Sequence, residues 1–292
     1  GTEEATKINQ NIAKAVEKLG LGMGLGSQRA AVENHALEKT YAIARKAAPN
    51  AFLIANLGGV QLVRGYGIEE IRKVIEMIDA DAVAIHLNAL QEAVQPEGQT
   101  NFKGVLAKIC EVAGEIDKPV IVKETGAGIS SEDAITLKEA GVRAIDVGGV
   151  GGTSFAAVEY FRGEKKLGEA FWDWGIPTVV STIEVVQSVK LPVIASGGVR
   201  TGTDIAKTLV LGASLAGIIQ PVLETAVVGS RETEQFLTGL IDELRNVMFL
   251  VGAKNIDSLS MVPVIICSKT AEWLKTRGFN IEKYAHRGVV NN

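Results

Sequence analysis

Residues 192–204 have the sequence Pro-Val-Ile-Ala-Ser-Gly-Gly-Val-Arg-Thr-Gly-Thr-Asp. This stretch contains three local structural signals in succession, and together they indicate the fold class. The run Pro192–Val199 begins as a short apolar stretch, which is typical of a parallel strand covered on both faces. The two glycines that follow indicate a tight turn. Thr201 and Asp204 have a spacing like that of a capping box, which predicts that a helix begins there. A strand, a turn and a helix in succession form the repeating unit of an α/β fold.

The same kind of unit recurs along the chain. Seven short runs rich in Val, Ile, Leu, Ala and Gly alternate with amphipathic stretches, and their starts lie 24 to 48 residues apart. Because a βαβ unit takes roughly 30 residues or more and such a barrel has eight strands, we expect an α/β chain folded as a TIM (β/α)8 barrel. Gly1–Glu4 has the composition of a strand-to-helix turn, so we expect the first strand to be absent from this chain. The seven runs are Leu21–Gly26, Ala51–Leu57, Ala82–Asn88, Pro119–Thr125, Ala144–Val150, Pro192–Val199 and Ala216–Val222.

Capping residues and apolar periodicity predict several helices. Thr2 and Ser130 each precede acidic residues and an amphipathic stretch, as expected where a helix begins. Glu232–Leu250 and Thr270–Arg277 also have helical periodicity. No low-complexity linker interrupts the chain. We therefore expect one domain over residues 1–292, with an insertion at 153–191 after the fifth run and a helical extension at 252–292.

Aromatic residues concentrate in the expected insertion. Such rings either pack in a core or an interface, or they form a lid over a pocket, and the sequence leaves both open. The residues are Phe155, Tyr160, Phe161, Phe171, Trp172 and Trp174.

Composition excludes several classes of protein. With 30 basic and 34 acidic residues the net charge is -4, which disfavours nucleic acid or an anionic membrane as a partner. A hydrophobic share of 47% excludes a disordered chain. Cys110 and Cys267 lie far apart, which does not suit a metal knuckle or a disulfide scaffold. No apolar run approaches the roughly 20 residues of a membrane span, and we expect a cytoplasmic protein.

Polar residues follow every predicted strand. In a (β/α)8 barrel the active site lies at the carboxyl ends of the strands, so these residues predict a site. The strand ends are Gly26–Arg29, Asn56–Gly59, His86–Asn88, Lys123–Thr125, Gly148–Ser154, Ser196–Arg200 and Gln220–Pro221.

Two of these ends predict a phosphate site. The glycines of Ser196–Arg200 and Gly148–Ser154 would let backbone N–H groups approach a phosphate. The alternative is that these glycines only form tight turns and bind no phosphate. Lys123 ends a buried strand, where an unpaired ammonium is costly. Its partner is expected to be an anionic group, such as the oxygen-bearing pyrimidine edge of a flavin, or else a salt bridge to Glu124 or Asp146.

The segment His86–Gly98 carries the densest set of polar side chains. His86 and Asn88 share a face of their strand, and Gln91 and Glu92 follow in the loop. Glu92 suits a hard cation such as Mg²⁺, which binds through one or two carboxylates together with substrate phosphate. A buried core histidine and a solvated carboxylate are the alternative.

Together these loops resemble those of the type 2 isopentenyl-diphosphate isomerases. The resemblance runs from Gly1 to about Arg277, and His86–Gly98 is its most specific part. The family's strand ending in Met-Thr-Gly-Gly corresponds here only to Gly1-Thr2, and its upstream basic segment has no counterpart. The other matching segments are Gly26–Arg29, Asn56–Gly58, Lys123–Gly126, Gly148–Thr153, Asp173–Thr178 and Ser196–Arg200.

This resemblance implies an activity and its cofactors. The family interconverts isopentenyl and dimethylallyl diphosphate in isoprenoid biosynthesis, using reduced FMN and Mg²⁺, with NAD(P)H or another donor as reductant. It also implies a homo-oligomer, a tetramer or an octamer. By position, Glu92 would hold Mg²⁺, and Arg29, His86, Asn88 and Gln91 would face the substrate. The residues implied for FMN are Ser27, Asn56, Lys123, Thr153, Gly197, Gly198, Arg200 and Ala216.

Allylic isomerisation adds one proton and removes another without net redox change. Gln91 is an amide without a useful pKa, so no pair of side chains is an evident acid and base. Our hypothesis is that reduced FMN relays the proton through N5 or N1, that the catalytic residues Gln91 and His86 orient it, and that Mg²⁺ and Arg29 neutralise the diphosphate. The alternatives are an FMN-dependent oxidoreductase of a small hydroxy acid and a phosphate-binding barrel inactivated by truncation. A net change in flavin redox state would identify the oxidoreductase.

Overall fold

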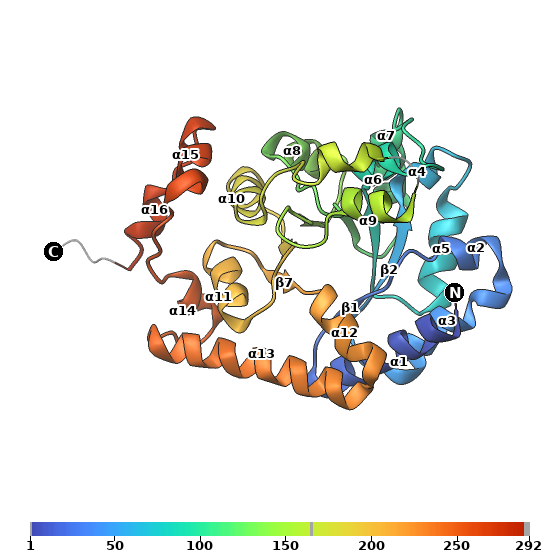
Figure 1. The fold of residues 1–292 in the computed structure, drawn as a ribbon, viewed down its shortest axis with the longest axis horizontal. Helices are drawn as coiled ribbons and strands as arrows, with labels where there is room; N and C mark the ends of the chain where they lie inside the picture. The colour runs from blue at the N-terminus through green and yellow to red at the C-terminus, as the bar shows by residue number, and fades with distance from the viewer. Residues whose placement is uncertain (1, 164–165, 289–292) are drawn as a thin grey trace.

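A single parallel sheet forms the centre of the molecule (Figure 1). The computed structural model describes residues 2–163 and 166–288; Gly1 of the predicted strand end and the last four residues of the predicted extension lie outside this part. The seven strands found there follow one another in chain order, and each pairs in parallel with the next. They are β1 (Met23–Gly24), β2 (Leu53–Gly58), β3 (Ala82–His86), β4 (Val120–Lys123), β5 (Ala144–Asp146), β6 (Val193–Ser196) and β7 (Leu215–Gly217).

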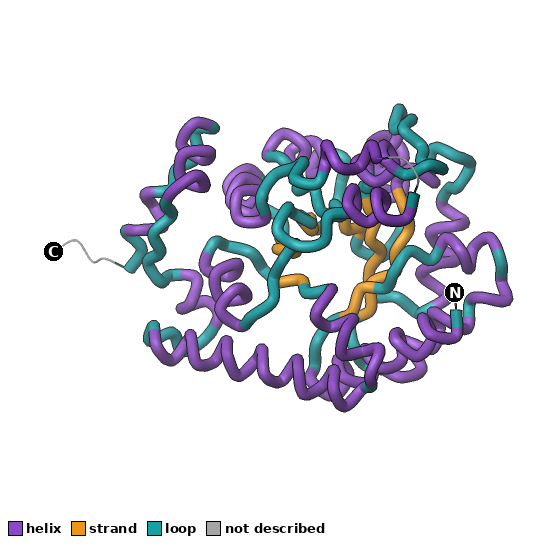
Figure 2. Tube along the Cα trace, viewed as in Figure 1, coloured by secondary structure: helices purple, strands orange, loops and turns teal. Residues whose placement is uncertain are grey.

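Helices surround this sheet, as Figure 2 shows. The elements that precede β5 are α1 (Glu3–Leu19), α2 (Arg29–Glu33), η1 (His35–Leu37), α3 (Lys39–Ala47), α4 (Gly59–Leu62), α5 (Ile68–Met77), α6 (Ala89–Val94), α7 (Val105–Glu115) and α8 (Ser131–Glu139). Those that follow β5 are α9 (Phe155–Arg162), η2 (Lys166–Phe171), α10 (Thr178–Ser188), α11 (Gly202–Val210), α12 (Gln220–Val228), α13 (Ser230–Leu250), α14 (Ile256–Ser260), α15 (Ser268–Thr276) and α16 (Glu282–Ala285). Consecutive parallel strands joined by outer helices are the arrangement of a TIM-type barrel.

All seven predicted runs contain strand residues, but every strand is shorter than its predicted run, and the seventh run also extends into a helix. The run Ala216–Val222 was expected to be strand throughout, whereas β7 ends at Gly217 and α12 begins at Gln220. Pro221 explains the difference, because a proline in the first turn of a helix needs no hydrogen-bond acceptor for its nitrogen.

The predicted helix starts are confirmed by their capping hydrogen bonds. Thr2 Oγ1 accepts from the backbone N–H of Ala5 at 3.0 Å, and Ser130 Oγ accepts from that of Asp133 at 3.1 Å. Thr201 and Asp204 form the expected reciprocal pair at the start of α11. Each such cap contributes about 1 kcal/mol to stability.

Alternation along the strands separates two apolar layers. Leu53, Leu57, Ile85 and Val122 are fully buried in the main core, which includes residues of the surrounding helices. The other face carries a smaller cluster of buried residues, contributed by neighbouring strands. Its members, including the partly buried ones, are Ile54, Ala82, Ala84, Ile121, Ala144 and Ile194. Because side chains alternate with a period of two, the residues that follow this cluster along each strand share its face.

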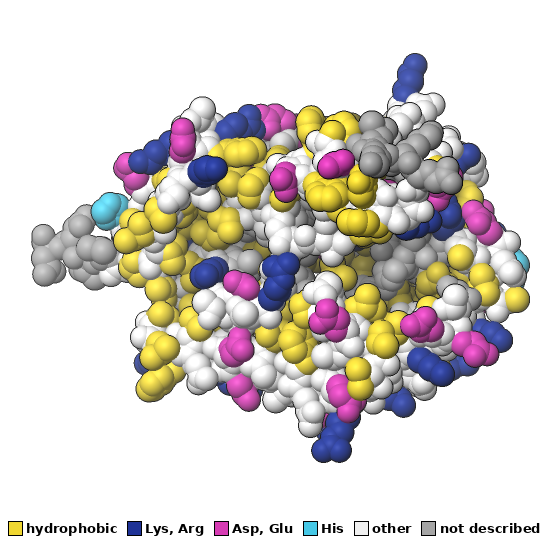
Figure 3. All heavy atoms as spheres, in the orientation of Figure 1, with side chains coloured by type: hydrophobic (Ala, Val, Ile, Leu, Met, Phe, Trp, Pro, Cys, Tyr) yellow, Lys and Arg dark blue, Asp and Glu magenta, His cyan; other side chains and the backbone are white. Residues whose placement is uncertain are grey.

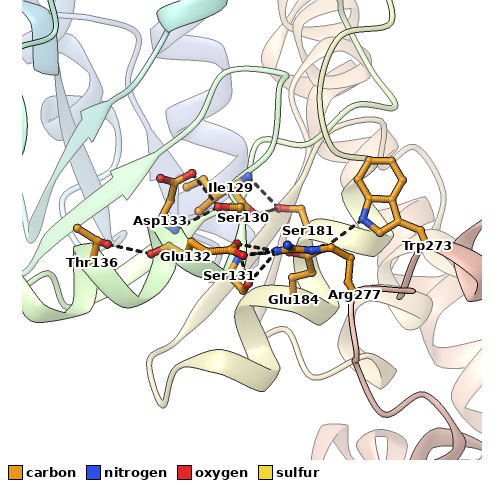
Figure 4. A network of polar contacts seen from close by, with 10 residues as sticks. All are labelled: Ile129, Ser130, Ser131, Glu132, Asp133, Thr136, Ser181, Glu184, Trp273 and Arg277. Carbon is orange, nitrogen blue, oxygen red and sulfur yellow. Dashed lines mark hydrogen bonds and ion pairs between the residues drawn. The ribbon is translucent and has the colours of Figure 1, made fainter. Parts of the chain in front are cut away.

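A polar network fixes the C-terminal helices to the rest of the fold (Figure 4). Arg277, just after α15, pairs with Glu132 of α8 at 2.6 Å and with Glu184 of α10 at 3.2 Å. The Glu184 side chain is buried, and Trp273 Nε1 donates to it as well, at 3.2 Å. Leu274 and Tyr284 pack with residues of α10 in a second core.

The aromatic residues after β5 lie mostly near the surface. Tyr160 packs edge-on against Phe161 and Trp172, with ring centroids 5.2 and 5.3 Å apart. Phe161 is 77% exposed and Trp174 is 62% exposed, so these two rings do not belong to the core.

Candidate active site

A row of three ionisable side chains crosses the carboxyl edge of the sheet. His86, Lys123 and Asp146 end β3, β4 and β5, and the strand register pairs His86 with Lys123 and Lys123 with Asp146. Each lies two residues beyond a member of the smaller apolar cluster, so all three share its face. We call these residues the strand-edge row. The row starts beside Gly58, the register partner of His86, where a Cβ would lie only 2.9 Å from His86 Nε2.

Asn56 fixes the tautomer of His86, and burial fixes its protonation state. The Asn56 Nδ2 donates to the backbone carbonyl of Leu25 at 2.8 Å, so its oxygen faces His86 Nδ1, also at 2.8 Å. Nδ1 therefore carries the proton and donates it to this bond. Burial, reinforced by the charges of Lys123 and Arg29, lowers the pKa of His86 to about 3. His86 is thus a neutral imidazole with an unprotonated Nε2.

A fully buried glutamine that sequence reasoning overlooked holds Asn56 in place. Gln28 Oε1 accepts from the backbone N–H of Asn56, and Gln28 Nε2 donates to the carbonyl of Val74, both at 2.9 Å. The sequence signal that could have identified Gln28 is its position as a polar residue within the predicted strand end Gly26–Arg29. Asn56, which the resemblance implies for FMN, also orients the histidine.

A cavity of about 290 Å³ lies beside this row and brings together most of the predicted substrate and metal residues. The predicted residues that line it are Ser27, Arg29, His86, Asn88, Gln91 and Glu92. The others are Ala30, Gln61, Arg64, Gln95, Glu97 and Gln99. A larger hollow of about 850 Å³ lies over α5 and α7, but none of the strand-end side chains lines it.

Glu92 is a buried carboxylate surrounded by neutral donors. Its oxygens accept from Asn88 Nδ2 and Gln95 Nε2, each at 2.9 Å, and from the backbone N–H of Gln99 at 2.7 Å. The buried Oδ1 of Asn88 has no hydrogen-bond partner among the described residues. A buried anion next to an unpaired oxygen suits a hard cation, for which oxygen ligands are preferred. Among residues 2–163 and 166–288, no group of three or more His, Cys, Asp or Glu forms a complete metal site.

Gln91 is held by a residue distant in sequence. Its Nε2 donates to Glu159 Oε1 at 2.8 Å, and Glu159 pairs with Arg162 at 2.9 Å. The Glu159 side chain is 1% exposed although it lies on α9, within the expected insertion. Sequence reasoning missed Glu159, because a single carboxylate in a mostly apolar helix is the only local signal that marks it.

The two predicted glycine loops form one structure. A Cβ on Gly152 would lie 2.8 Å from the backbone nitrogen of Gly198, and one on Gly151 would lie 2.9 Å from the carbonyl oxygen of Gly197. Only glycine permits so close an approach of two backbones. Thr178 Oγ1 donates to the Gly197 carbonyl at 2.7 Å and lies 3.2 Å from that of Val150, which ties the loops together.

Arg200 also bridges the glycine loops. Its Nη1 donates to the carbonyls of Gly198 at 2.9 Å and Gly151 at 3.3 Å. Thr153 follows the first loop and is exposed, and Ala216 lies on β7 opposite Ala195. These predicted FMN residues therefore surround the edge of β5, β6 and β7.

Lys123 donates to a backbone carbonyl, that of Glu124, at 3.1 Å. The Glu124 carboxylate instead accepts from the N–H groups of Thr125 and Ala127, so it fixes the following loop. Burial lowers the pKa of Lys123, and the charges of Asp146 and Glu124 oppose this effect. A buried ammonium and a close-packed glycine loop are the groups that an anionic, phosphate-bearing cofactor requires, so these residues fit FMN.

Comparison with known proteins agrees with this geometry. The family model described as FMN-dependent dehydrogenase matches residues 68–264. Solved structures of mandelate oxidase share the fold, with a TM-score of 0.60 at 20% identity over 86% of this chain and 72% of that one. At this identity the likeness supports the TIM-type barrel alone.

Sequence relatives identify the family. The isopentenyl-diphosphate delta-isomerase of Methanothermobacter thermautotrophicus is 54% identical over 288 residues, covering 98% of this chain and 81% of the relative. That of Pyrococcus furiosus is 50% identical, covering 94% and 72% respectively. The chain belongs to the isopentenyl-diphosphate delta-isomerase family. The resemblance to the type 2 isomerases is therefore confirmed. The enzyme is an isomerase that contains a domain of the FMN-dependent dehydrogenase family.

In this isomerase, the predicted residues form two groups at one edge of the sheet. The cavity contains the substrate and metal residues, together with Ser27. The glycine loops and Lys123 lie along the later strands. None of the described helices is long and apolar enough to cross a membrane.

Proposed function

We propose that this isomerase binds isopentenyl or dimethylallyl diphosphate in the cavity of about 290 Å³, with FMN over the strand-edge row. The observation that carries this proposal is the buried carboxylate of Glu92, which has no cationic partner among the described residues and lies beside the Asn88 oxygen that has no hydrogen-bond partner there, in a cavity that Arg29 also lines. A diphosphate and Mg²⁺ would supply the charges that these groups lack. We accordingly assign Glu92 to Mg²⁺, and Arg29 and Asn88 to the substrate.

FMN would occupy the groups that fit it. Gly197, Gly198, Thr153 and Arg200 would surround its phosphate, and Lys123 would face its pyrimidine edge, with Ser27 and Ala216 close to it. When bound in reduced form, FMN supplies a group able to give and take a proton near the alkene.

The side chains of the cavity orient and neutralise the substrate. Gln91, fixed by Glu159, can donate its second amide hydrogen or accept through its oxygen. His86 presents an unprotonated Nε2, fixed by Asn56. We therefore propose that these two catalytic residues orient the groups that exchange the proton, at a near-contact distance from the allylic carbons of the substrate. Positioning contributes most to the rate at such a distance.

We also propose the setting in which the enzyme works. Two free, exposed cysteines support a reducing, cytoplasmic compartment. NAD(P)H is the reductant that the resemblance to the type 2 isomerases implies. Exposed apolar residues support association into a homo-oligomer, for which the resemblance implies a tetramer or an octamer; Ile219, Val228 and Phe249 are 68, 72 and 83% exposed. Figure 3 shows hydrophobic side chains on the surface toward the C-terminal helices. The FMN-binding domain would be a TIM-type barrel built on this parallel sheet.

The experiment is an anaerobic assay with isopentenyl diphosphate, Mg²⁺ and the FMN-loaded protein. We expect dimethylallyl diphosphate to form with reduced flavin and almost none with oxidised flavin. A small 2-hydroxy acid should leave the oxidised flavin spectrum unchanged. Reduction of the flavin by the hydroxy acid, without isomerisation by the reduced protein, would favour the oxidoreductase instead.

A further inference from the structure

Asp146 is a buried carboxylate of the strand-edge row, beside the lysine assigned to FMN. It is the register partner of Lys123, so both side chains leave the sheet on the same face. Ser196 Oγ donates to Asp146 Oδ1 at 2.5 Å, and the backbone N–H of Gly148 donates to the same oxygen at 3.2 Å. The carboxylate is therefore fixed by residues next to both glycine loops.

Lys123 requires a negative charge nearby, because a buried, unpaired ammonium is costly. Glu124 is a poor source of that charge: burial raises the pKa of Glu124 to about 7, and its carboxylate is engaged by two backbone N–H groups. Burial also raises the pKa of Asp146, but the Lys123 charge and the Ser196 hydrogen bond oppose that effect. Burial shifts both groups toward their neutral forms, and the charge of Asp146 and that of Lys123 each oppose the shift of the other.

We propose that Asp146 is a positioning residue for Lys123, supplying the buried negative charge that keeps the lysine an ammonium at the edge of the flavin site. The inference rests on the proposed seat of FMN beside Lys123. A fixed ammonium at the pyrimidine edge favours the more electron-rich, reduced cofactor and so raises its midpoint potential. Asp146 acts on the cofactor through Lys123.

A direct effect of Asp146 on the flavin would have the opposite sign. A carboxylate close to the ring disfavours added electron density, so removing its charge would raise the midpoint potential. Removing a carboxylate that maintains the ammonium would lower the potential. The sign of the change therefore distinguishes the two roles.

The test measures FMN dissociation constants and midpoint potentials for Asp146→Asn, Lys123→Met and the double variant. We expect Asp146→Asn to weaken FMN binding about tenfold and to lower the midpoint potential, as Lys123→Met does. The double variant should be no worse than Lys123→Met alone, because residues that act as a unit are not additive. Asp117→Asn, at an exposed aspartate ahead of β4, removes the same charge and should change neither quantity.

Ser196→Ala provides a second variant that retains the Asp146 charge. It should change both quantities in the same direction as Asp146→Asn but less, since only the hydrogen bond that fixes the carboxylate is lost. A higher midpoint potential in Asp146→Asn, or additive effects in the double variant, would overturn the role of Asp146. Unchanged FMN binding and potential in Lys123→Met would instead refute the seat of FMN, and the inference with it.

Discussion

Glu92 and Glu124 are both buried carboxylates, but their surroundings give them different tasks. Among the described residues, Glu92 accepts only from neutral groups, and it lines the cavity, so a cation can still be added. Glu124 accepts from the backbone of its own loop and contributes to the shape of the strand end. Substitution of Glu92 should therefore change the Mg²⁺ requirement, and substitution of Glu124 should change the pH dependence of stability.

Glu92→Gln should raise the Mg²⁺ concentration needed for half-maximal isomerisation by about tenfold or more, because it removes a charged oxygen ligand at nearly constant volume. FMN should remain bound. Glu97→Gln is the matched control: Glu97 lines the same cavity but is exposed and pairs with Arg162 at 3.6 Å. An unaltered Mg²⁺ titration in Glu92→Gln would exclude Glu92 as the ligand.

Glu124 predicts a pH dependence of stability. Its pKa is about 7 in the folded protein against an ordinary value of 4.5, because of burial. Between these values the folded protein binds more protons than the unfolded chain, so Glu124 makes stability fall as the pH rises. As the pH rises from 4.5 to 7, the free energy of unfolding of the wild type should fall by on the order of 3 kcal/mol relative to that of Glu124→Gln, which has no carboxylate to ionise. Urea denaturation across this range measures the difference, with the exposed Glu115→Gln as control. A constant difference would contradict the assigned pKa.

The glycine loops act as one element, since their backbones touch. Gly198→Ala should weaken FMN binding by at least about tenfold, because φ is +82° there and a Cβ would collide with the backbone of Gly151. Riboflavin lacks the phosphate, so its binding should change less. Gly252→Ala controls for strain alone, having φ +72° but open space around it. Equal losses for FMN and riboflavin would argue against a phosphate site in these loops.

The C-terminal helices depend on Arg277. Arg277→Gln would leave Glu184 buried without its cation, which should cost about 2 kcal/mol, less than for a fully enclosed pair because Arg277 is 38% exposed. Chemical denaturation measures the loss. Arg245→Gln removes an exposed pair with Asp242 and should cost below about 0.5 kcal/mol. Equal costs for the two variants would show that the network in Figure 4 does not fix the C-terminal helices.

Elements whose signals are local were predictable from the sequence. Strands buried on both faces appear as apolar runs, and the caps at Thr2, Ser130 and Thr201 lie within a few residues of their partners. The end of β7 was misjudged because apolar residues continue into α12, so Gln220-Pro221 was the only boundary signal.

The site was predictable where it follows strand ends and not where it depends on distant packing. The cavity unites Arg29, His86 and Gln91 because all parallel strands present their carboxyl ends at one edge. The partners of these residues were not predictable. Glu159 reaches Gln91 from 68 positions away, through the packing of α9 on α6. Thr178 likewise reaches the glycine loops from α10.

At the scale of the whole molecule, one sheet brings two half-sites to a single edge. Loops after β1, β2 and β3 enclose the cavity, and loops after β5 and β6 supply the glycines. The strand-edge row on β3, β4 and β5 lies between them. This order places the substrate residues beside the position proposed for the flavin ring, as proton transfer between them requires.

We propose that the enzyme moves protons without consuming redox equivalents. The most direct measurement follows isopentenyl diphosphate, Mg²⁺ and chemically pre-reduced, FMN-loaded enzyme in D₂O without oxidant. We expect many turnovers, deuterium in the dimethylallyl product and a flavin that is still reduced at the end, with incorporation strongly suppressed in Gln91→Ala. Consumption of one redox equivalent per product, or unaltered deuterium incorporation in Gln91→Ala, would contradict this proposal.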